Sequence, residues 1–123
     1  MRCLVLAAVC GSILGGGPVG AQEGMWRAFK SGEELLRDCR SETSESRALC
    51  RGYIMALNDV LSGFGAVVDG TRACLEGDES VEELIALVTD YLEANPGVRS
   101  INADGLVAYA LALRYPCDAK RPR

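Results

Sequence analysis

Residues 47–64 read RALCRGYIMALNDVLSGF, and this stretch decides the fold. Apolar side chains recur in it at spacings of three and four, the repeat of a helix with one buried side. A second face combines small residues with Met55 and Asp59, and small side chains let a neighbouring helix approach closely. We therefore predict a long helix over 47–64, in which Asp59 is partly buried. The predicted buried stripe is Leu49, Tyr53, Leu57, Val60, Leu61 and Phe64, and the small-residue face is Gly52, Ala56, Ser62 and Gly63.

Three shorter helices are predicted around this one from their start and stop signals. Two begin with a Ser and a Glu three residues later, the spacing of a capping box; these pairs are Ser31–Glu34 and Ser80–Glu83. The first of the two helices ends near Arg40 and the second at Pro96. A last helix is predicted between Asn102 and Pro116. The residues predicted to face inward are Leu35, Leu36, Cys39, Val81, Leu84, Ile85, Val88, Leu92, Leu106, Ala110, Leu113 and Cys117. The predicted fold class is all-α, a small up-down bundle of four helices.

The N-terminus has the pattern of a secretory signal peptide. Arg2 precedes an apolar run over 4–14, and Val19 and Ala21 occupy the positions read by signal peptidase. We predict cleavage after residue 21, which leaves a helical domain over 22–123 in the periplasm, with no stable membrane insertion. Lipid attachment at Cys10 is a weaker alternative, because Val9 stands where a small residue is expected.

Four cysteines remain after cleavage, an even number suited to disulfides in an oxidising compartment. No two of them lie two to four residues apart, and the chain contains no histidine, so zinc is the weaker interpretation. In the bundle, Cys39 and Cys50 lie at one pole, and Cys74 and Cys117 at the other. The predicted pairs are therefore Cys39–Cys50 and Cys74–Cys117, although the sequence by itself allows three pairings.

No pattern of catalytic residues is recognisable. The absence of histidine excludes Ser-His-Asp and Cys-His nucleophiles, and no phosphate-binding or metal-ligand spacing is present. Adjacent carboxylates occur at helix starts, where they suit the helix dipole. The mature chain has 12 basic and 17 acidic residues, a net charge of −5 that argues against nucleic-acid binding. We predict a protein that is not an enzyme and has no cofactor or metal.

Several segments of the chain, taken in their order along the sequence, resemble the Rap/Tai family of immunity proteins associated with type VI secretion. The matching stretches are Cys39, 50–54, Asp59, 74–76, Val81, Leu84, 90–96, Ala103, 106–107, 110–111 and 115–117. Gly52, Tyr53, Asp59 and Pro116 belong to these family positions. The sequence departs from the family pattern at Ala56, where Gly is frequent, and at Glu76, where Pro is frequent.

The resemblance implies a periplasmic helical protein that binds a secreted effector toxin, in some members a cell-wall amidase, and covers its active site with a loop. The candidate loops are 41–46 and 65–79. Whether the chain is a monomer or a homodimer stays open. An acid-activated periplasmic chaperone, similar to HdeA in size and disulfide content, is the alternative, together with another non-enzymatic envelope protein.

Overall fold

The computed structural model describes residues 29–117, and within this range the regular structure is helical. Its elements are α1 (Gly32–Arg40), α2 (Ser44–Leu61), α3 (Val81–Ala94), the 3₁₀ helix η1 (Pro96–Val98) and α4 (Ala103–Arg114). The prediction of an all-helical domain with four α-helices is confirmed. The predicted signal peptide, the lipidation alternative at Cys10 and the tail after Cys117 lie outside the described residues.

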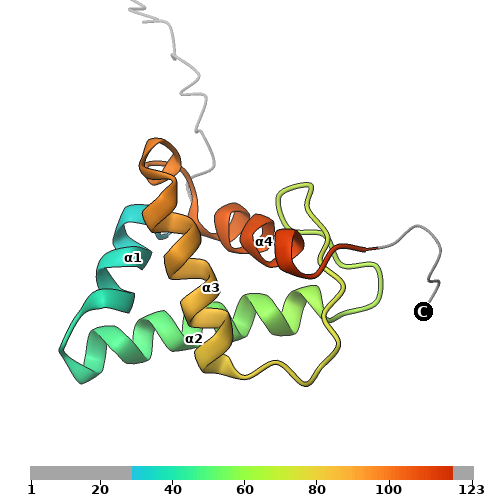
Figure 1. Ribbon diagram of the computed structural model, residues 1–123, viewed down its shortest axis with the longest axis horizontal. Helices are drawn as coiled ribbons and strands as arrows, with labels where there is room; N and C mark the ends of the chain where they lie inside the picture. Colours follow the sequence, from blue (N-terminus) through green and yellow to red (C-terminus); the bar gives the residue numbers. More distant parts are fainter. Residues whose placement is uncertain (1–28, 118–123) are drawn as a thin grey trace, which may run out of the picture.

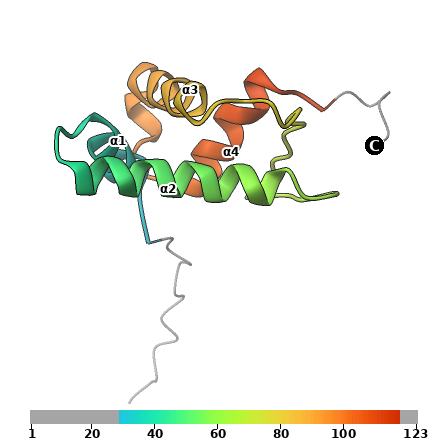
Figure 2. The ribbon, with the colours of Figure 1, turned by 90° about the horizontal axis from the view of Figure 1, so that it is seen from below.

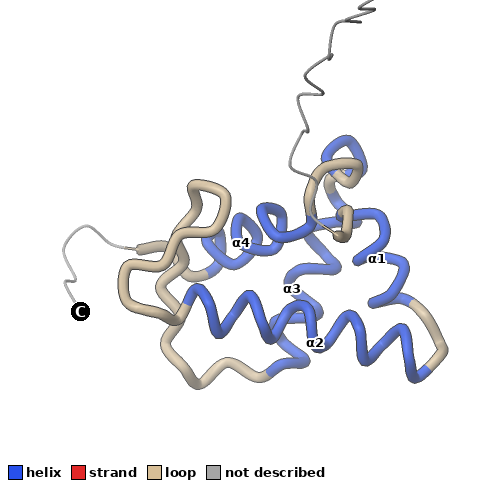
Figure 3. The backbone as a smooth tube through the Cα atoms, turned by 180° about the vertical axis from the view of Figure 1, so that it is seen from behind, coloured by secondary structure: helices blue, strands red, loops and turns tan. Residues whose placement is uncertain are grey.

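The helices cross one another around a shared core. In Figure 1, α1 and α3 lie across the direction of α2 and α4, and Figure 2 shows α2 along one side of the domain with the other helices above it. A short connection joins α1 to α2, whereas a long loop, residues 62–80, joins α2 to α3 at the opposite end of α2 (Figure 3). One side of α2 is therefore left without a neighbouring helix.

Two disulfides connect segments of the described fold. Cys39 in α1 bonds to Cys50 in α2, and Cys74 in the long loop bonds to Cys117 just past α4. Both bonds are the predicted ones. The first ties α1 to α2 across a short connection, and the second closes a much longer segment of chain.

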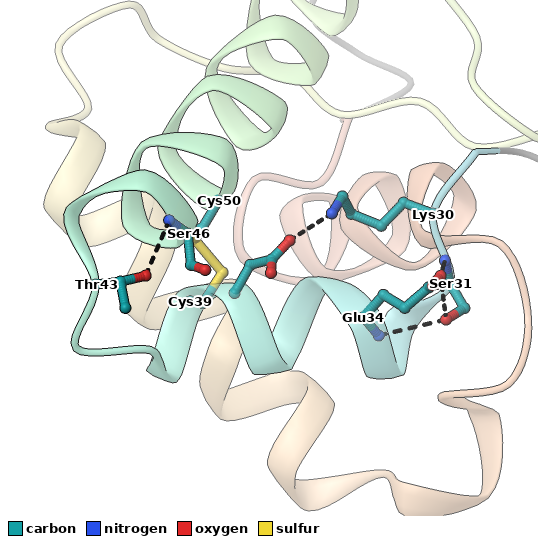
Figure 4. Close-up of polar contacts among 8 residues, drawn as sticks. Lys30, Ser31, Glu34, Cys39, Thr43, Ser46 and Cys50 are labelled. Carbon is teal, nitrogen blue, oxygen red and sulfur yellow. Dashed lines mark hydrogen bonds and ion pairs between the residues drawn. A yellow bond between two sulfur atoms is a disulfide. The ribbon is translucent and has the colours of Figure 1, made fainter.

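The start of α1 is held by a capping box within the helix and by a hydrogen bond to the segment before α4; the capping box is drawn in Figure 4. Ser31 and Glu34 form the predicted capping box, with the Glu34 carboxylate accepting from the Ser31 N–H at 2.8 Å. The pKa of Glu34 is held below its usual value, chiefly by this backbone hydrogen bond. The Gly32 N–H donates to the carbonyl of Ile101 at 3.0 Å, which attaches the start of α1 to the segment before α4.

A buried carboxylate that the sequence did not indicate lies in the last turn of α1. Asp38 is 8% exposed and forms an ion pair with Lys30. A carboxylate buried to this extent is costly without a charged partner, which Lys30 supplies from the residues just before the helix. This pair therefore orients the segment that leads into α1.

A second charged contact involves Arg99, which lies a few residues after α3. Its Nε donates to the carbonyl of Leu92 at 2.6 Å and its Nη2 to the carbonyl of Glu93 at 2.9 Å. Carbonyls in the last turn of a helix have no partner within the helix. Arg99 therefore caps the C-terminal end of α3 with a charged donor.

The core is formed mainly by α3, α4 and one side of α2. Its largest fully buried side chains are Leu35, Ile54, Leu61, Leu84, Leu92, Leu111, Val88, Val107 and Cys50. The inward residues predicted for α3 are buried or half-buried. In α4 the prediction was wrong for Leu113, which is 61% exposed, because the side of α4 that faces the core is lined by Val107 and Leu111.

The buried stripe predicted for α2 was wrong in part. Leu61 is buried and Tyr53 and Leu57 are half-buried, but Leu49 and Val60 are 59% and 52% exposed. Phe64 is also exposed, because α2 ends at Leu61 and the helical repeat no longer applies there. The true core side of α2 is Cys50, Ile54 and Leu61.

Candidate functional site

Residues 62–80 form the longest irregular segment between the helices, and several contacts attach this loop to the domain. Ala73 and Leu75 are buried in the core, on either side of the disulfide-bonded Cys74. The Cys74 N–H donates to the carbonyl of Tyr115 at 2.8 Å. The base of the loop is therefore anchored, while Phe64, 90% exposed, and Val67, 53% exposed, project from its first half.

A tight turn shapes the middle of this loop. The backbones of Val68 and Thr71 exchange hydrogen bonds of 2.9 and 2.8 Å around Asp69 and Gly70. Both central residues have positive φ, 46° and 74°, the conformation that Asp-Gly favours in a two-residue turn. The Asp-Gly dipeptide was the sequence signal that could have predicted this turn.

Asp69 also brings the turn against α4. A Cβ placed on Gly105 would lie 2.4 Å from Oδ2 of Asp69 and 3.2 Å from its Cβ. Only glycine leaves enough room for this approach, so Gly105 lets the loop pack on the first turn of α4. The loop is thus positioned by the Asp69 turn as well as by the disulfide.

The other predicted loop, 41–46, is shorter in the structure. Thr43 caps α2 by accepting from the Ser46 N–H at 3.3 Å, so residues 44–46 already belong to the first turn of the helix (Figure 4). Only residues 41–43 connect α1 to α2. The predicted helix start near Arg47 was therefore three residues late, because Thr43 caps a helix that begins at Ser44.

Between the two loops lies a row of exposed apolar and small residues, which we call the outer face of α2. Its members are Leu49, Gly52, Met55, Ala56, Val60 and the adjoining Gly63. No described helix covers this face, so the predicted packing of a neighbouring helix on the small residues was wrong. A Cβ on Gly52 would meet nothing within 4 Å. Within α2 the face extends over residues 49–60, about 17 Å along the helix axis, and it adjoins the long loop at Gly63.

The free space around Gly52 allows a direct test of this description. Gly52→Ala is expected to raise the free energy of unfolding of the monomer by about 0.5–1 kcal/mol, because alanine favours a helix and meets no neighbour. Urea denaturation at low protein concentration measures this change. Gly32→Ala is the matched control and is expected to destabilise, since its Cβ would lie 2.5 Å from Leu106 Cδ1 and 3.1 Å from the Arg99 carbonyl oxygen. Destabilisation by Gly52→Ala would mean that this face is covered in the monomer.

The residues singled out by the sequence do not gather at one place. Gly52 and Asp59 are exposed along α2, which corrects the expectation that Asp59 is partly buried. Helix geometry explains its exposure, because Asp59 lies on the side of α2 away from Ile54. Pro116 is exposed beside Cys117, and Tyr53 lies half-buried at the edge of α2. The four residues therefore do not form a common pocket.

Among the described residues, Tyr53 has the pKa that departs most from its ordinary value. Burial, together with the nearby carboxylate of Asp104, raises its pKa to about 12. The phenol therefore keeps its proton at neutral pH and cannot act as a base there. Oδ1 of Asp104 is buried without a hydrogen-bond partner in the structure. We therefore interpret Tyr53 and Asp104 as part of the packing between α2 and α4.

Most of the adjacent carboxylates near helix starts have structural partners. Glu82 pairs with Arg51, which lowers the pKa of the Glu82 carboxyl, and Glu83 accepts from the Tyr115 hydroxyl at 3.2 Å. Glu79 accepts from the N–H groups of Glu76 and Gly77 at 2.6 and 2.9 Å. Over residues 29–117, no three metal-ligating side chains gather in a way that could hold an ion. These carboxylates stabilise helix starts and loops.

Taken together, the described residues present an anchored loop with projecting apolar side chains next to an exposed helix face that also carries Asp59. None of the helices between residues 29 and 117 has the length and apolar character needed to cross a bilayer.

Comparison with known proteins gives one match. Neither a curated protein nor a solved structure matches the chain. A family model, described as Rap1a immunity proteins, matches residues 31–117, which includes all four helices, the long loop and both disulfides. The chain belongs to the Rap1a family of immunity proteins.

Proposed function

We propose that this chain is a periplasmic immunity protein that binds a secreted effector toxin and blocks it without performing any chemistry. The observation that carries the proposal is the family match over residues 31–117, nearly the whole of the predicted mature domain. Both disulfides require an oxidising compartment for their formation, which agrees with export. The toxin is proposed to arrive by type VI secretion, and a cell-wall amidase is one proposed target.

The loop 62–80 is the proposed contact with the toxin. An inhibitor loop gains affinity when it is held in its bound shape before association, because less conformational entropy is lost on binding. Here the Cys74–Cys117 disulfide and the Asp69 turn hold the loop, while Phe64 and Val67 project as apolar anchors. A loop of this kind can enter the cleft of an enzyme and exclude its substrate.

The first experiment is capture of the toxin by the oxidised mature chain, residues 22–123, from an extract of its own organism. Bound proteins are identified by mass spectrometry, and each candidate is then purified and assayed with increasing amounts of the chain. The expected result is one partner whose hydrolase activity falls to zero at equal molar amounts. Binding of many unrelated envelope proteins after acid treatment, with no inhibited enzyme, would favour the chaperone alternative instead.

The double substitution Phe64→Ser and Val67→Ser is expected to weaken toxin binding at least tenfold. Each large apolar side chain buried in an interface contributes roughly 1.5–3 kcal/mol, and about 1.4 kcal/mol corresponds to a tenfold change in Kd. Calorimetric titration measures the affinity. Leu113→Ser is the matched control, because Leu113 is a comparably exposed apolar residue on α4. Equal affinity of all three proteins would rule out the loop as the contact.

A further inference from the structure

We propose that Asp69 and Gly70 form a site of spontaneous isoaspartate formation, a slow modification of the chain that loosens the attachment of the loop 62–80 to α4. In isoaspartate, the main chain continues through the side-chain carboxyl group of the aspartate instead of its α-carboxyl group. The site lies within the loop proposed to contact the toxin, but the chemistry needs no toxin. The inference therefore goes beyond the proposed function and does not rest on it.

The reaction uses only these two residues and water. The amide nitrogen of Gly70 attacks Cγ of Asp69, and the hydroxyl of the protonated carboxyl group leaves with the amide proton as water, which closes a five-membered succinimide. A second water then attacks the carbonyl carbon of the original peptide bond and breaks its C–N bond. The chain now runs through Cγ, the α-carboxylate is free, and the mass is unchanged. Glycine favours the first step because it has no Cβ beside the attacking nitrogen.

The chain contains this dipeptide twice, and the structure places the two copies in different surroundings. Asp69 and Gly70 are both exposed at the centre of the two-residue turn in the loop. Asp104 and Gly105 are half-buried in the first turn of α4. The intrinsic chemistry of the two pairs is the same, so any difference in their rates reports the fold around them.

The rate depends on how often each segment opens, because the attacking nitrogen has to swing over the carboxyl carbon. At the turn, opening breaks the two hydrogen bonds between Val68 and Thr71. Asp69 is also the one described residue other than glycine with a positive φ, a conformation that side chains disfavour. Exposed turns open far more often than elements that contribute to the core. The turn is therefore expected to react.

The copy in α4 is protected by the core. Opening at Asp104 would unwind the start of the helix, and the buried Leu106 and Val107 follow directly after Gly105. Such an opening exposes core side chains and approaches the cost of global unfolding. The fold thus selects one of two identical dipeptides for modification.

The modification alters the part of the loop that contacts α4. It adds one methylene to the main chain and takes the carboxylate away from the end of the Asp69 side chain. The native fit is close, since Oδ2 and Cβ of Asp69 lie 2.4 and 3.2 Å from the position that a Cβ on Gly105 would take. A longer main chain cannot keep both this fit and the hydrogen bonds of the turn. Residues 62–70 are therefore released, while the Cys74–Cys117 disulfide keeps the base of the loop attached.

The test follows both dipeptides in the oxidised chain, residues 22–123, during storage in warm neutral buffer over several weeks. Trypsin cleaves after arginine and places the two sites in separate peptides without cysteine, residues 52–72 and 100–114. Each peptide is then incubated with an isoaspartyl carboxyl methyltransferase and labelled S-adenosylmethionine, which marks the free α-carboxylate. The expected result is label in 52–72 that accumulates at least ten times faster than label in 100–114.

The same chain, reduced and unfolded in guanidinium chloride, is the matched control. Both peptides should then label at similar rates, because the fold no longer distinguishes the two dipeptides. The substitutions Asp69→Asn and Asp104→Asn give a second readout, since the succinimide then forms with release of ammonia. In the folded chain, Asp69→Asn is expected to release ammonia at least ten times faster than Asp104→Asn. Circular dichroism of both variants checks that the fold is intact.

Two results would overturn the proposed site. One is equal labelling of both peptides in the folded chain, and the other is label in 52–72 that appears only after unfolding. The effect on the loop is measured with chymotrypsin, which cleaves after Phe64. The modified chain, separated by chromatography, should be cut there at least ten times faster than the fresh chain, and equal cutting would overturn the proposed loosening of the loop.

Discussion

Replacing Cys74 and Cys117 together by serine is expected to lower the free energy of unfolding by about 4 kcal/mol. The bond closes a segment with a sequence separation of 43, and cross-linking a loop of this length removes much of the entropy of the unfolded chain. A domain of ordinary stability has only about 5–15 kcal/mol in total. Urea denaturation under oxidising conditions measures the change.

The control for this prediction is the other disulfide. Cys39 and Cys50 have a sequence separation of 11, so that replacing both by serine is expected to cost about 3 kcal/mol on the same entropy argument. The Cys74–Cys117 variant should also be cleaved faster by protease within residues 62–80, whereas the Cys39–Cys50 variant should not. Equal stability of the wild type and the Cys74–Cys117 variant would show that the loop is held by packing alone.

Ile54→Ala is expected to destabilise the domain by about 2–5 kcal/mol. Ile54 is fully buried on the core side of α2, and removal of a large apolar side chain from a core loses its transfer free energy and leaves a cavity. The measurement is the midpoint and slope of a urea unfolding curve, taken at a concentration at which the chain is monomeric.

Leu49→Ala on the same helix is the matched control. Leu49 is 59% exposed on the outer face of α2, so this substitution is expected to change the free energy of unfolding by less than about 0.5 kcal/mol. The pair of variants thus decides which side of α2 faces the core. A larger loss from Leu49→Ala than from Ile54→Ala would mean that the helix is rotated from the orientation described above.

Leu49 and Ile54 also illustrate why the sequence predicted one side of α2 incorrectly. The helix is apolar over more than half of its circumference, so a repeat of three and four residues fits more than one face. The rotation is chosen by contacts with α1, α3 and α4, above all by the buried Cys50 bonded to Cys39. The contacts of α2 with α3 and α4 are distant in sequence and have no local signature.

Asp38 and Arg99 were missed for a related reason. A charged residue within a helix is ordinarily exposed, and its burial depends on whether a partner from another segment reaches it. Lys30 and the carbonyls at the end of α3 supply those partners only when the chain is folded. The candidate site was likewise predicted as two loops, whereas the tertiary structure added the exposed helix face between them.

The sequence by itself determined where α1, α3 and α4 begin and to which family the chain belongs, and the predicted arrangement of the helices selected the observed cysteine pairs from the three possible pairings. Serine caps act within one helical turn, and two cysteines near the ends of consecutive helices are brought together by chain connectivity. The tertiary structure alone decided which side of α2 is buried, which charges are paired inside and how the loop 62–80 is held against α4. Those outcomes depend on close packing between distant segments, where the space left by residues such as Gly32 and Gly105 sets what can approach.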